Sequence, residues 1–487
     1  MERRIRGPGR RAGTCGRPAS DCVRVAVLLI SETASMDVMR SMKDVFDSVD
    51  ANVDRATQML VRLVSQPSVA ATGLGIGECS KLVFGLLEEL GARPKIYDVG
   101  EGSPVVTGEV KSKSNPSKTV LFYNHYDVQP PEPLDLWETP PFQPTVRDGK
   151  MYGRGVSDDK AELVGRLNLT KAFLEATGDL PCNFKFLFEG EEEIGSVHLH
   201  EYLKRFPEIF RADSVVWEFG GVDPKDRPNV VLGVKGILYV ELTAKHAKRD
   251  AHSSLGAIVD NPAWRLVGAL NSIKQGDKIV VPGWYDAVKP LTKDELAVIK
   301  AQPYEAQAVR RDLGIARFIG GMGTEEAKKA LVNKPTCTIC GMSSGYTGKG
   351  SKTVLPSEAM AKIDFRLVPE QDPRDLHRKL VGHLAKRGYR DVKVTYSEGE
   401  PAKRTSFKAP ISVAAQQGAS EVFGVKPVVT ISSAGTGPMF LFEAPCVAIG
   451  GGNPFSHAHA PNENLRLDLF VKGMKWVAAT VGRFASS

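Results

Sequence analysis

Short apolar runs alternate with amphipathic segments along the first half of the chain. Residues 120–123, 184–188 and 214–217 are too short for helices and rich in β-branched and aromatic side chains, which predicts buried strands. Leucines recur at helical spacing over residues 157–178, with Ser157 as the expected N-cap. This strand–helix–strand order predicts an α/β fold with a mostly parallel sheet that carries helices on both faces.

The pattern of apolar positions changes after Gly236. A strand is expected over residues 237–243, and residues 359–368 alternate strictly between apolar and polar side chains. Helices with an apolar stripe are expected around residues 262–270 and 376–384, and a further strand follows the second helix. This order predicts a small α+β domain of ferredoxin-like type.

The length of 487 residues exceeds what one hydrophobic core usually holds, which predicts two domains. Because the α/β pattern resumes later, we expect the small domain (237–404) to be inserted into a larger one (36–236 and 405–487). Residues 1–35 hold seven arginines, three acids and no apolar periodicity. We interpret them as a disordered or non-native extension, with translation starting at one of the two methionines that follow; a transit peptide is the alternative.

The charge and cysteine content of the chain argue against a nucleic-acid-binding protein and against a disulfide-bonded secreted one. The formal net charge is +7, of which +4 lies in the first 35 residues, so the rest carries too little positive charge for a nucleic-acid surface. No segment is apolar enough to span a membrane. Seven scattered cysteines predict a reducing compartment, the cytoplasm. We interpret the isolated pair Cys337 and Cys340 as a strand with buried thiols rather than a zinc or redox site.

Acidic and imidazole side chains follow the three apolar runs. His125 ends the first run, the acids at 191–193 follow the second, and Glu218 follows the third. The carboxyl ends of parallel strands meet at one crevice, and imidazole and carboxylate are natural ligands of zinc-like cations. A solvated charge run or a surface histidine would explain each group alone. Together they predict a metal site.

Further candidates lie in two loops. Asp158 and Asp159 follow a glycine turn, which suits a carboxylate that bridges two cations, although helix capping would also explain them. Asp127 could accept the second ring N–H of His125. Among the acids at 191–193, one could bind metal while a neighbour activates water. One of the two histidines at 457 and 459 is the expected ligand from the C-terminal part of the chain.

Five motifs resemble the M20 clan of dinuclear metallopeptidases, over about residues 45–485, and are most similar to its dipeptidase branch. The motifs are Asn124-His-Tyr-Asp-Val-Gln-Pro130, Trp137-Glu-Thr-Pro-Pro-Phe142, Tyr152-Gly-Arg-Gly-Val-Ser-Asp-Asp-Lys160, Glu189-Gly-Glu-Glu-Glu-Ile-Gly-Ser196 and His459-Ala-Pro-Asn-Glu463. The resemblance implies a zinc-peptidase catalytic domain, with the small domain as its lid and dimerisation domain.

The resemblance also implies a division of roles. One metal would be held by His125, Asp158 and Glu218, and the other by Asp158, Glu193 and His459. Glu192 would be the general base, Asp127 would orient His125, and the Asp158–Asp159 peptide would be cis.

Substrate-binding residues are expected in the small domain and beside it. By resemblance, His252 would reach the active site of a partner subunit, and Thr353 and Arg366 would bind the substrate carboxylate; Thr436 completes this set. Arg366 lies on the polar face of its strand, and a guanidinium clamps carboxylates with two hydrogen bonds.

The resemblance implies hydrolysis of a peptide bond in dipeptides or short peptides with a free carboxylate, by a homodimer with two divalent ions per subunit. Zinc is expected, with manganese or cobalt as alternatives. Glu218 stands where the dipeptidase branch typically has Asp, so an N-acyl amino acid hydrolase or a carboxypeptidase remains the alternative, and an inactive scaffold that only binds ligands is a remote one. Glu191 stands where relatives often have Met, and no role is predicted for it.

Overall fold

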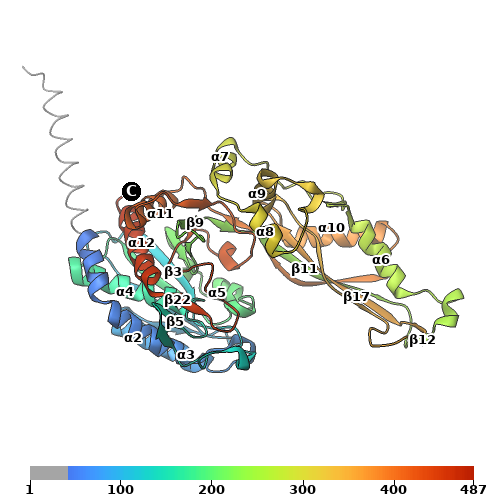
Figure 1. Cartoon of the computed structure of the whole chain (residues 1–487), viewed down its shortest axis with the longest axis horizontal. Helices are drawn as coiled ribbons and strands as arrows, with labels where there is room; N and C mark the ends of the chain where they lie inside the picture. Colours follow the sequence, from blue (N-terminus) through green and yellow to red (C-terminus); the bar gives the residue numbers. More distant parts are fainter. Residues whose placement is uncertain (1–41) are drawn as a thin grey trace, which may run out of the picture.

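The computed structural model describes residues 42–487, which form two units placed side by side (Figure 1). The larger unit is built on a nine-stranded sheet and the smaller one on a four-stranded antiparallel sheet. The prediction for residues 1–35 lies outside the described residues. No helix of the described part is long and apolar enough to cross a membrane.

The central sheet is mixed, and its parallel part lies in the middle. Its strands follow the order β1 (Lys95–Tyr97), β2 (Val105–Val110), β6 (Asn183–Glu189), β3 (Thr119–His125), β7 (Ser214–Trp217), β21 (Cys446–Ala448), β9 (Pro228–Val231) and β20 (Val428–Thr430), with β8 (Gly221–Val222) paired to β9. The pairs among β6, β3, β7 and β21 are parallel. β1, β2 and β8 pair antiparallel. The parallel core of the sheet is as predicted, and the antiparallel strands β1, β2 and β8 lie outside this core and lack long apolar runs.

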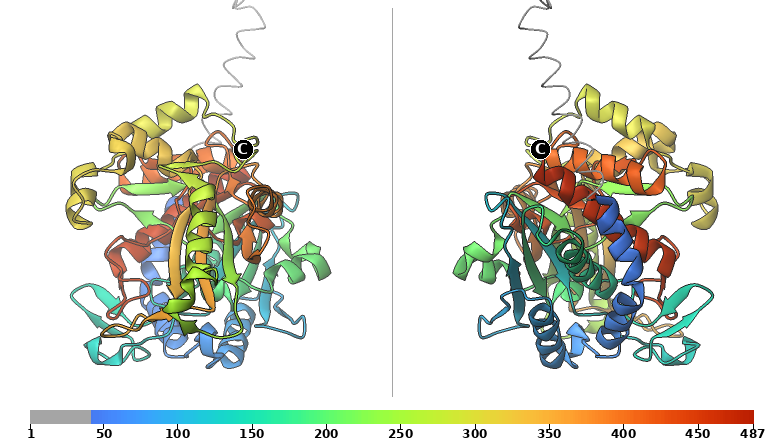
Figure 2. Two further views of the ribbon diagram at one scale, coloured as in Figure 1. Left: turned by 90° about the vertical axis from the view of Figure 1, so that its right-hand side faces the viewer. Right: turned by 90° about the vertical axis from the view of Figure 1, so that its left-hand side faces the viewer.

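Helices cover both faces of this sheet (Figures 1 and 2). The helices of the larger unit that pack on its main core are α2 (Val53–Val64), α3 (Ile76–Glu89), α4 (Lys160–Thr177), α11 (Pro410–Phe423) and α12 (Leu467–Ala485). α4 ends at Gly178 in the left-handed conformation, as glycine favours. The predicted N-cap at Ser157 is wrong, because the helix begins at Lys160 and Asp159 holds the N-cap position.

The smaller unit contains the predicted strands and helices and more. Its sheet has the order β15 (Thr338–Ser344), β17 (Glu358–Leu367), β11 (Gly236–Lys245) and β18 (Val392–Glu400), with α6 (Pro262–Ile273) and α10 (Pro373–Lys386) packed on its core. The apolar residues that alternate along β17 are buried, as the pattern predicts. Three helices of this unit were not predicted: α7 (Lys293–Ala301), α8 (Ala306–Asp312) and α9 (Thr324–Asn333).

The two-cysteine segment is a strand, as expected, but only one of its thiols is buried. Cys337 is 7% exposed, whereas Cys340 lies exposed on β15 at the edge of the sheet. An edge strand has no neighbour on one side, so period-two spacing does not guarantee burial there.

The chain crosses between the units at a short ribbon of two strands, β10 (Gly233–Val234) and β19 (Lys403–Arg404). The predicted boundaries of the inserted domain lie next to this ribbon. The backbone N–H of Lys235 donates to the Gly435 oxygen at 2.8 Å, so the start of β11 is held against a loop of the larger unit.

Candidate metal centre and active site

The site lies at the carboxyl ends of the parallel strands. His125 is the last residue of β3, Glu192 begins a 3-10 turn just after β6, and Glu218 directly follows β7. These strands run parallel, so their carboxyl ends meet at one edge of the sheet, as the sequence predicted. A cleft of about 400 Å³ opens there, lined by Asp158, Glu192, Glu218, Thr436 and His459 among others.

Asp158 lies between two histidines. Its Oδ1 is 3.1 Å from His125 Nε2 and its Oδ2 is 3.0 Å from His459 Nε2. His459 Nε2 is also 3.0 Å from Glu193 Oε2. Burial acts to raise the pKa of Asp158, but the hydrogen bonds to both histidines prevail and hold it well below its ordinary value. The carboxylate is thus ionised and shared by both imidazoles.

His459 and His125 are strongly basic in this setting. The hydrogen bonds to Asp158 and Glu193 raise the pKa of His459 to about 10. Burial works against the charged form of His125, yet Asp127 and Asp158 raise its pKa well above the ordinary value. Three carboxylates lie beside two imidazoles. A divalent cation would be bound by this set of ligands, with the imidazoles giving up their extra protons. Asp158, Glu193 and His459 offer ligand atoms that all lie within 4.8 Å of one another.

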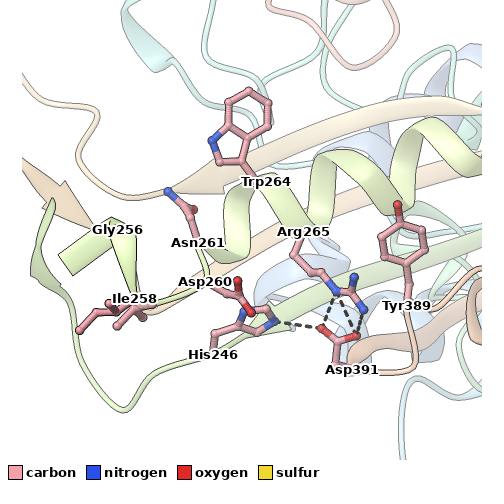
Figure 3. Close-up of a pocket in the computed structure, with 10 residues that line it drawn as sticks. His246, Gly256, Ile258, Asp260, Asn261, Trp264, Arg265, Tyr389 and Asp391 are labelled. Carbon is pink, nitrogen blue, oxygen red and sulfur yellow. Dashed lines mark hydrogen bonds and ion pairs between the residues drawn. The ribbon is translucent and has the colours of Figure 1, made fainter. Parts of the chain in front are cut away.

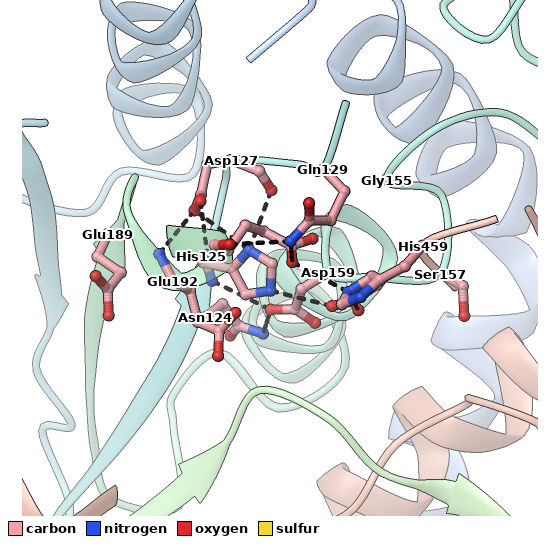
Figure 4. A network of polar contacts seen from close by, with 12 residues as sticks. Asn124, His125, Asp127, Gln129, Gly155, Ser157, Asp159, Glu189, Glu192 and His459 are labelled. Carbon is pink, nitrogen blue, oxygen red and sulfur yellow. Dashed lines mark hydrogen bonds and ion pairs between the residues drawn. The ribbon is translucent and has the colours of Figure 1, made fainter. Parts of the chain in front are cut away.

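Asp127 contacts both His125 and the turn that carries Glu192 and Glu193 (Figure 4). Its carboxylate lies 3.3 Å from His125 Nδ1, and its backbone oxygen lies 3.1 Å from the same nitrogen. The carboxylate also accepts two backbone N–H groups, that of Glu192 on Oδ1 at 3.3 Å and that of Glu193 on Oδ2 at 3.0 Å. Asp127 therefore fixes the histidine ring and the acidic turn at once.

Two acids in the cleft, Glu192 and Glu218, form no ion pair with another side chain of residues 42–487. Glu218 is 5% exposed, and its Oε2 has no hydrogen-bond partner in this part of the chain. Burial, followed by repulsion from Glu192, raises the pKa of Glu218 well above its ordinary value. Burial likewise raises the pKa of Glu192 to about 7, with His125 acting the other way. An orphaned buried carboxylate oxygen beside the imidazole–carboxylate cluster fits a divalent cation.

Glu463 supports the loop that carries Asp158, and the sequence reasoning assigned it no role. It accepts hydrogen bonds from the Arg154 guanidinium at 2.7 Å and from the backbone N–H groups of Gly155, Ser157 and Asp158 at 2.9 to 3.0 Å. Its place in the motif that begins at His459 was the available signal. The Asp158–Asp159 peptide in this loop is cis, as the resemblance implied.

Glu191 has a supporting part that the sequence did not reveal. Its carboxylate accepts the backbone N–H of Ser103 at 2.9 Å and lies 2.9 Å from His198 Nδ1. These partners lie on the side of the loop that precedes β2, away from the cluster of Asp158, Glu193 and His459. The three adjacent acids thus face different partners: Glu191 a neighbouring loop, Glu192 the cleft, and Glu193 the histidine at 459.

The residues expected to bind substrate fall into two groups. Arg366 lies near the cleft, and its Nη1 donates to Thr436 Oγ1 at 2.7 Å. His252 and Thr353 contact each other, with 3.2 Å between Nε2 and Oγ1. They lie by β12 (Ala251–His252), at the far end of the smaller unit (Figure 1). Within one chain the structure does not bring them to the Asp158 cluster.

Comparisons with known proteins agree on one family. The sequence model described as "Peptidase family M20/M25/M40" matches residues 121–483. The Beta-Ala-His dipeptidase of Homo sapiens is 29% identical, over 95% of this chain and 97% of its own length. The Cys-Gly metallodipeptidase dug1 of Schizosaccharomyces pombe is 28% identical, over 92% of this chain and 99% of its own length.

Solved structures give the same result. An M20 family metallo-carboxypeptidase, Sso-CP2 from Sulfolobus solfataricus, superposes with a TM-score of 0.83 and is 39% identical, covering 89% of this chain and 99% of its own. Human carnosine dipeptidase 1 superposes with a TM-score of 0.73 and is 28% identical, covering 92% of this chain and 100% of its own.

Proposed function

Because the chain belongs to the M20/M25/M40 peptidase family, we propose that it is a metal-dependent dipeptidase that hydrolyses the peptide bond of dipeptides or short peptides with a free carboxylate. The observation that carries this proposal is the position of Asp158 between His125 and His459, with Glu192 lining the same cleft. The names of the relatives, a Beta-Ala-His and a Cys-Gly dipeptidase, support dipeptides as the substrate class.

Two divalent cations would be held by five side chains. One would bind His125, Asp158 and Glu218, and the other Asp158, Glu193 and His459, so that Asp158 is shared. The orphaned oxygen of Glu218 and the close approach of Asp158 to both histidines support this assignment. Zinc suits imidazole and carboxylate donors, with manganese or cobalt as alternatives. When bound, such ions supply Lewis-acid polarisation of the scissile carbonyl and lower the pKa of water.

Glu192 would act as the general base. Its side chain lines the cleft and makes no hydrogen bond within residues 42–487, and its carboxylate would take a proton from the attacking water and pass it to the leaving amine. Asp127 would keep the ring of His125 and the backbone of Glu192 in place through the contacts described above. Arg366, with Thr436 beside it, would clamp the carboxylate of the substrate.

We propose a homodimer in which His252 and Thr353 serve the partner's active site. Their distance from the Asp158 cluster within one chain supports a role in trans. The adjoining surface is apolar: Trp264 is 76% exposed and Ile258 83% exposed, at the start of α6 and in the loop before it. Figure 3 shows Trp264 pointing away from the polar cluster of His246, Arg265 and Asp391, where a partner could cover it.

A second candidate function is carboxypeptidase activity on longer peptides. Two observations favour it: the 39% identity to a protein named as a metallo-carboxypeptidase, and the glutamate at position 218. Hydrolysis of N-acyl amino acids would use the same residues, because it also cuts an amide bond beside a free carboxylate. The five cysteines within residues 42–487 form no disulfide bonds with one another, which supports a reducing compartment, the cytoplasm.

A hydrolysis screen tests the proposal. Dipeptides, longer peptides and N-acyl amino acids are incubated with the protein and with added Zn²⁺, Mn²⁺ or Co²⁺, and the released amino acids are quantified. We expect metal-dependent release that is fastest from dipeptides. Faster trimming of longer peptides would favour the carboxypeptidase. No hydrolysis of any substrate with any of the metals would contradict the proposal and favour a scaffold that only binds ligands.

A further inference from the structure

A second cavity lies where the smaller unit meets the larger one. It has a volume of about 340 Å³ and is lined by Lys235 at the crossing point, Arg366 of β17, residues of α9 and Ala434 of the larger unit. This volume lies at the lower end of the range for small-molecule sites, about 300–1,000 Å³. The cavity is separate from the cluster around Asp158, and Arg366 is the one residue of its lining to which the proposed function assigns a part.

One wall of this cavity is apolar. Phe318 and Met322 come from the segment before α9, and Leu331 comes from α9 itself. Leu331 is 41% exposed, although its neighbour on the helix, Val332, is buried in a small core. Apolar side chains that stay open to a concave space are a feature of ligand sites.

The other wall carries positive charge. Lys235 is 3% exposed, and its ammonium group donates to the backbone oxygens of Lys334 at 2.8 Å and Ala330 at 3.2 Å. An ammonium group has three donors, and no carboxylate of residues 42–487 lies within ion-pair distance of this one. The acid of the lining, Asp277, is paired with Lys334 at 2.6 Å.

The burial of Lys235 without an anion is costly for the charged form. Burial, together with repulsion from Arg366 and Arg404, lowers the pKa of Lys235 to about 8. A bound anion would compensate this charge, because a buried ion is stabilised mainly by a partner of opposite sign.

We propose that this cavity binds an apolar molecule that carries one carboxylate, with the carboxylate at Lys235 and Arg366 and the apolar body against Phe318, Met322 and Leu331. Two sources share this chemistry: a free carboxylate such as a medium-chain fatty acid, and the C-terminal residue of an apolar peptide substrate. Arg366 connects the cavity to the catalytic cleft, because it lines the cavity and also donates to Thr436 in the cleft wall.

Octanoate is the probe for the test. Octylammonium, which has an eight-carbon chain of the same length and the opposite charge, is its control. Both are titrated into the purified full-length protein by calorimetry. We expect octanoate to bind and octylammonium not to bind. Lys235→Met removes the buried charge, and Leu331→Asp places a negative charge in the apolar wall; each should weaken octanoate binding about tenfold or more.

Lys328→Met is the matched control. Lys328 is also a buried lysine of this region, 5% exposed, that donates to two backbone oxygens, but it does not line the cavity. Its loss should leave octanoate binding unchanged. Octanoate binding that survives both Lys235→Met and Leu331→Asp, or that is matched by octylammonium, would overturn the proposal. Because binding is measured without substrate, a failure of the proposed peptidase activity does not affect this result.

Kinetics then separate the two sources of the ligand. Octanoate that competes with an apolar dipeptide identifies the pocket as the site of the substrate's C-terminal residue. Octanoate that changes turnover even at saturating dipeptide identifies a separate effector. In both cases Leu331→Asp should abolish the effect of octanoate.

Discussion

Arg366 donates a 2.7 Å hydrogen bond from Nη1 to Thr436 Oγ1, and this bond links the small antiparallel sheet to the wall of the cleft that Glu192 and His459 line. The other edge of the guanidinium is paired with Asp364, at 3.0 Å from Nη2 to Oδ2. The two contacts fix the plane of the guanidinium where the two units meet. A residue anchored in this way can recognise a carboxylate with a defined orientation.

Arg366→Lys should therefore weaken hydrolysis of substrates with a free carboxylate. The ammonium group keeps the charge but loses the planar pair of donors, so we expect kcat/KM to fall about tenfold or more. A C-amidated dipeptide should be hydrolysed equally poorly by both proteins. Arg378→Lys, on an exposed side chain of α10, is the control and should behave as the original protein does. An equal loss on the free and the amidated substrate would contradict carboxylate recognition.

Glu192→Gln should abolish turnover but retain metal. The amide has nearly the same shape as the carboxylate but cannot take a proton, and loss of a general base costs about 10²–10⁴-fold in rate. Steady-state kinetics and metal analysis of the same sample check both parts of this prediction. Glu191→Gln is the neighbouring control, because Glu191 binds Ser103 and His198 outside the cleft. Unchanged turnover in Glu192→Gln would remove Glu192 from this role.

Glu463→Gln should weaken metal binding without removing a ligand. The carboxylate accepts four hydrogen bonds that shape the loop of Asp158, and loss of such support typically costs about 10–100-fold in metal affinity. Competition with a chelator measures the change. Asp468→Asn, which alters an exposed acid paired with Arg466, should have no effect. Equal affinities in the two variants would show that the loop keeps its shape without the charge of Glu463.

The sequence predicted the parts of the molecule that have a strong local signal. β3, β6 and β7 are nearly continuous apolar runs, and each is followed by a group of the site, so both the core strands and His125, Glu192 and Glu218 could be placed. The outer strand β1 has only three residues, and its apolar content is too low to stand out. Helices α7 to α9 are short, and few of their residues are buried.

Contacts between distant segments could not be predicted from local patterns. The bond between Arg366 and Thr436 joins residues 70 positions apart, and the bond between Arg154 and Glu463 joins residues 309 apart. The partners of Glu191 were hidden for the same reason, because Ser103 lies in a loop without periodicity. Only the folded chain shows that this acid supports a loop rather than the site.

Glu189 should make the stability of the metal-free protein depend on pH. Burial raises the pKa of its carboxyl to about 8 from an ordinary value of 4.5, against the hydrogen bonds from Tyr123 and Ser196. Between these values the folded state binds a proton that the unfolded state has lost, so the free energy of unfolding falls as pH rises through this window. Glu189→Gln should reduce this fall. Urea unfolding with a chelator at about pH 5.5 and about pH 8 measures it.

Glu208→Gln, at an exposed position, is the control for this experiment and should keep the pH dependence of the original protein. A Glu189→Gln protein with the same loss of stability between the two pH values would show that other groups cause it.

The proposed exchange of His252 between subunits can be tested by mixing two inactive variants. His252→Ala should lose activity because its sites lack the imidazole that we assign to the partner, and Glu192→Gln should lose the base. In a mixed dimer, the subunit with His252→Ala still has Glu192 and receives His252 from the other chain. We therefore expect co-expression of the two variants to restore hydrolysis at one of the two sites.

The recovery should depend on the surface around α6. Trp264 is 76% exposed, so Trp264→Asp should disturb the interface more than the fold. Adding Trp264→Asp to both chains should abolish recovery and shift the protein toward the monomer in analytical ultracentrifugation. His252 acting within its own chain would give a different result: the mixture would be as inactive as its components, because neither chain would then contain both Glu192 and His252.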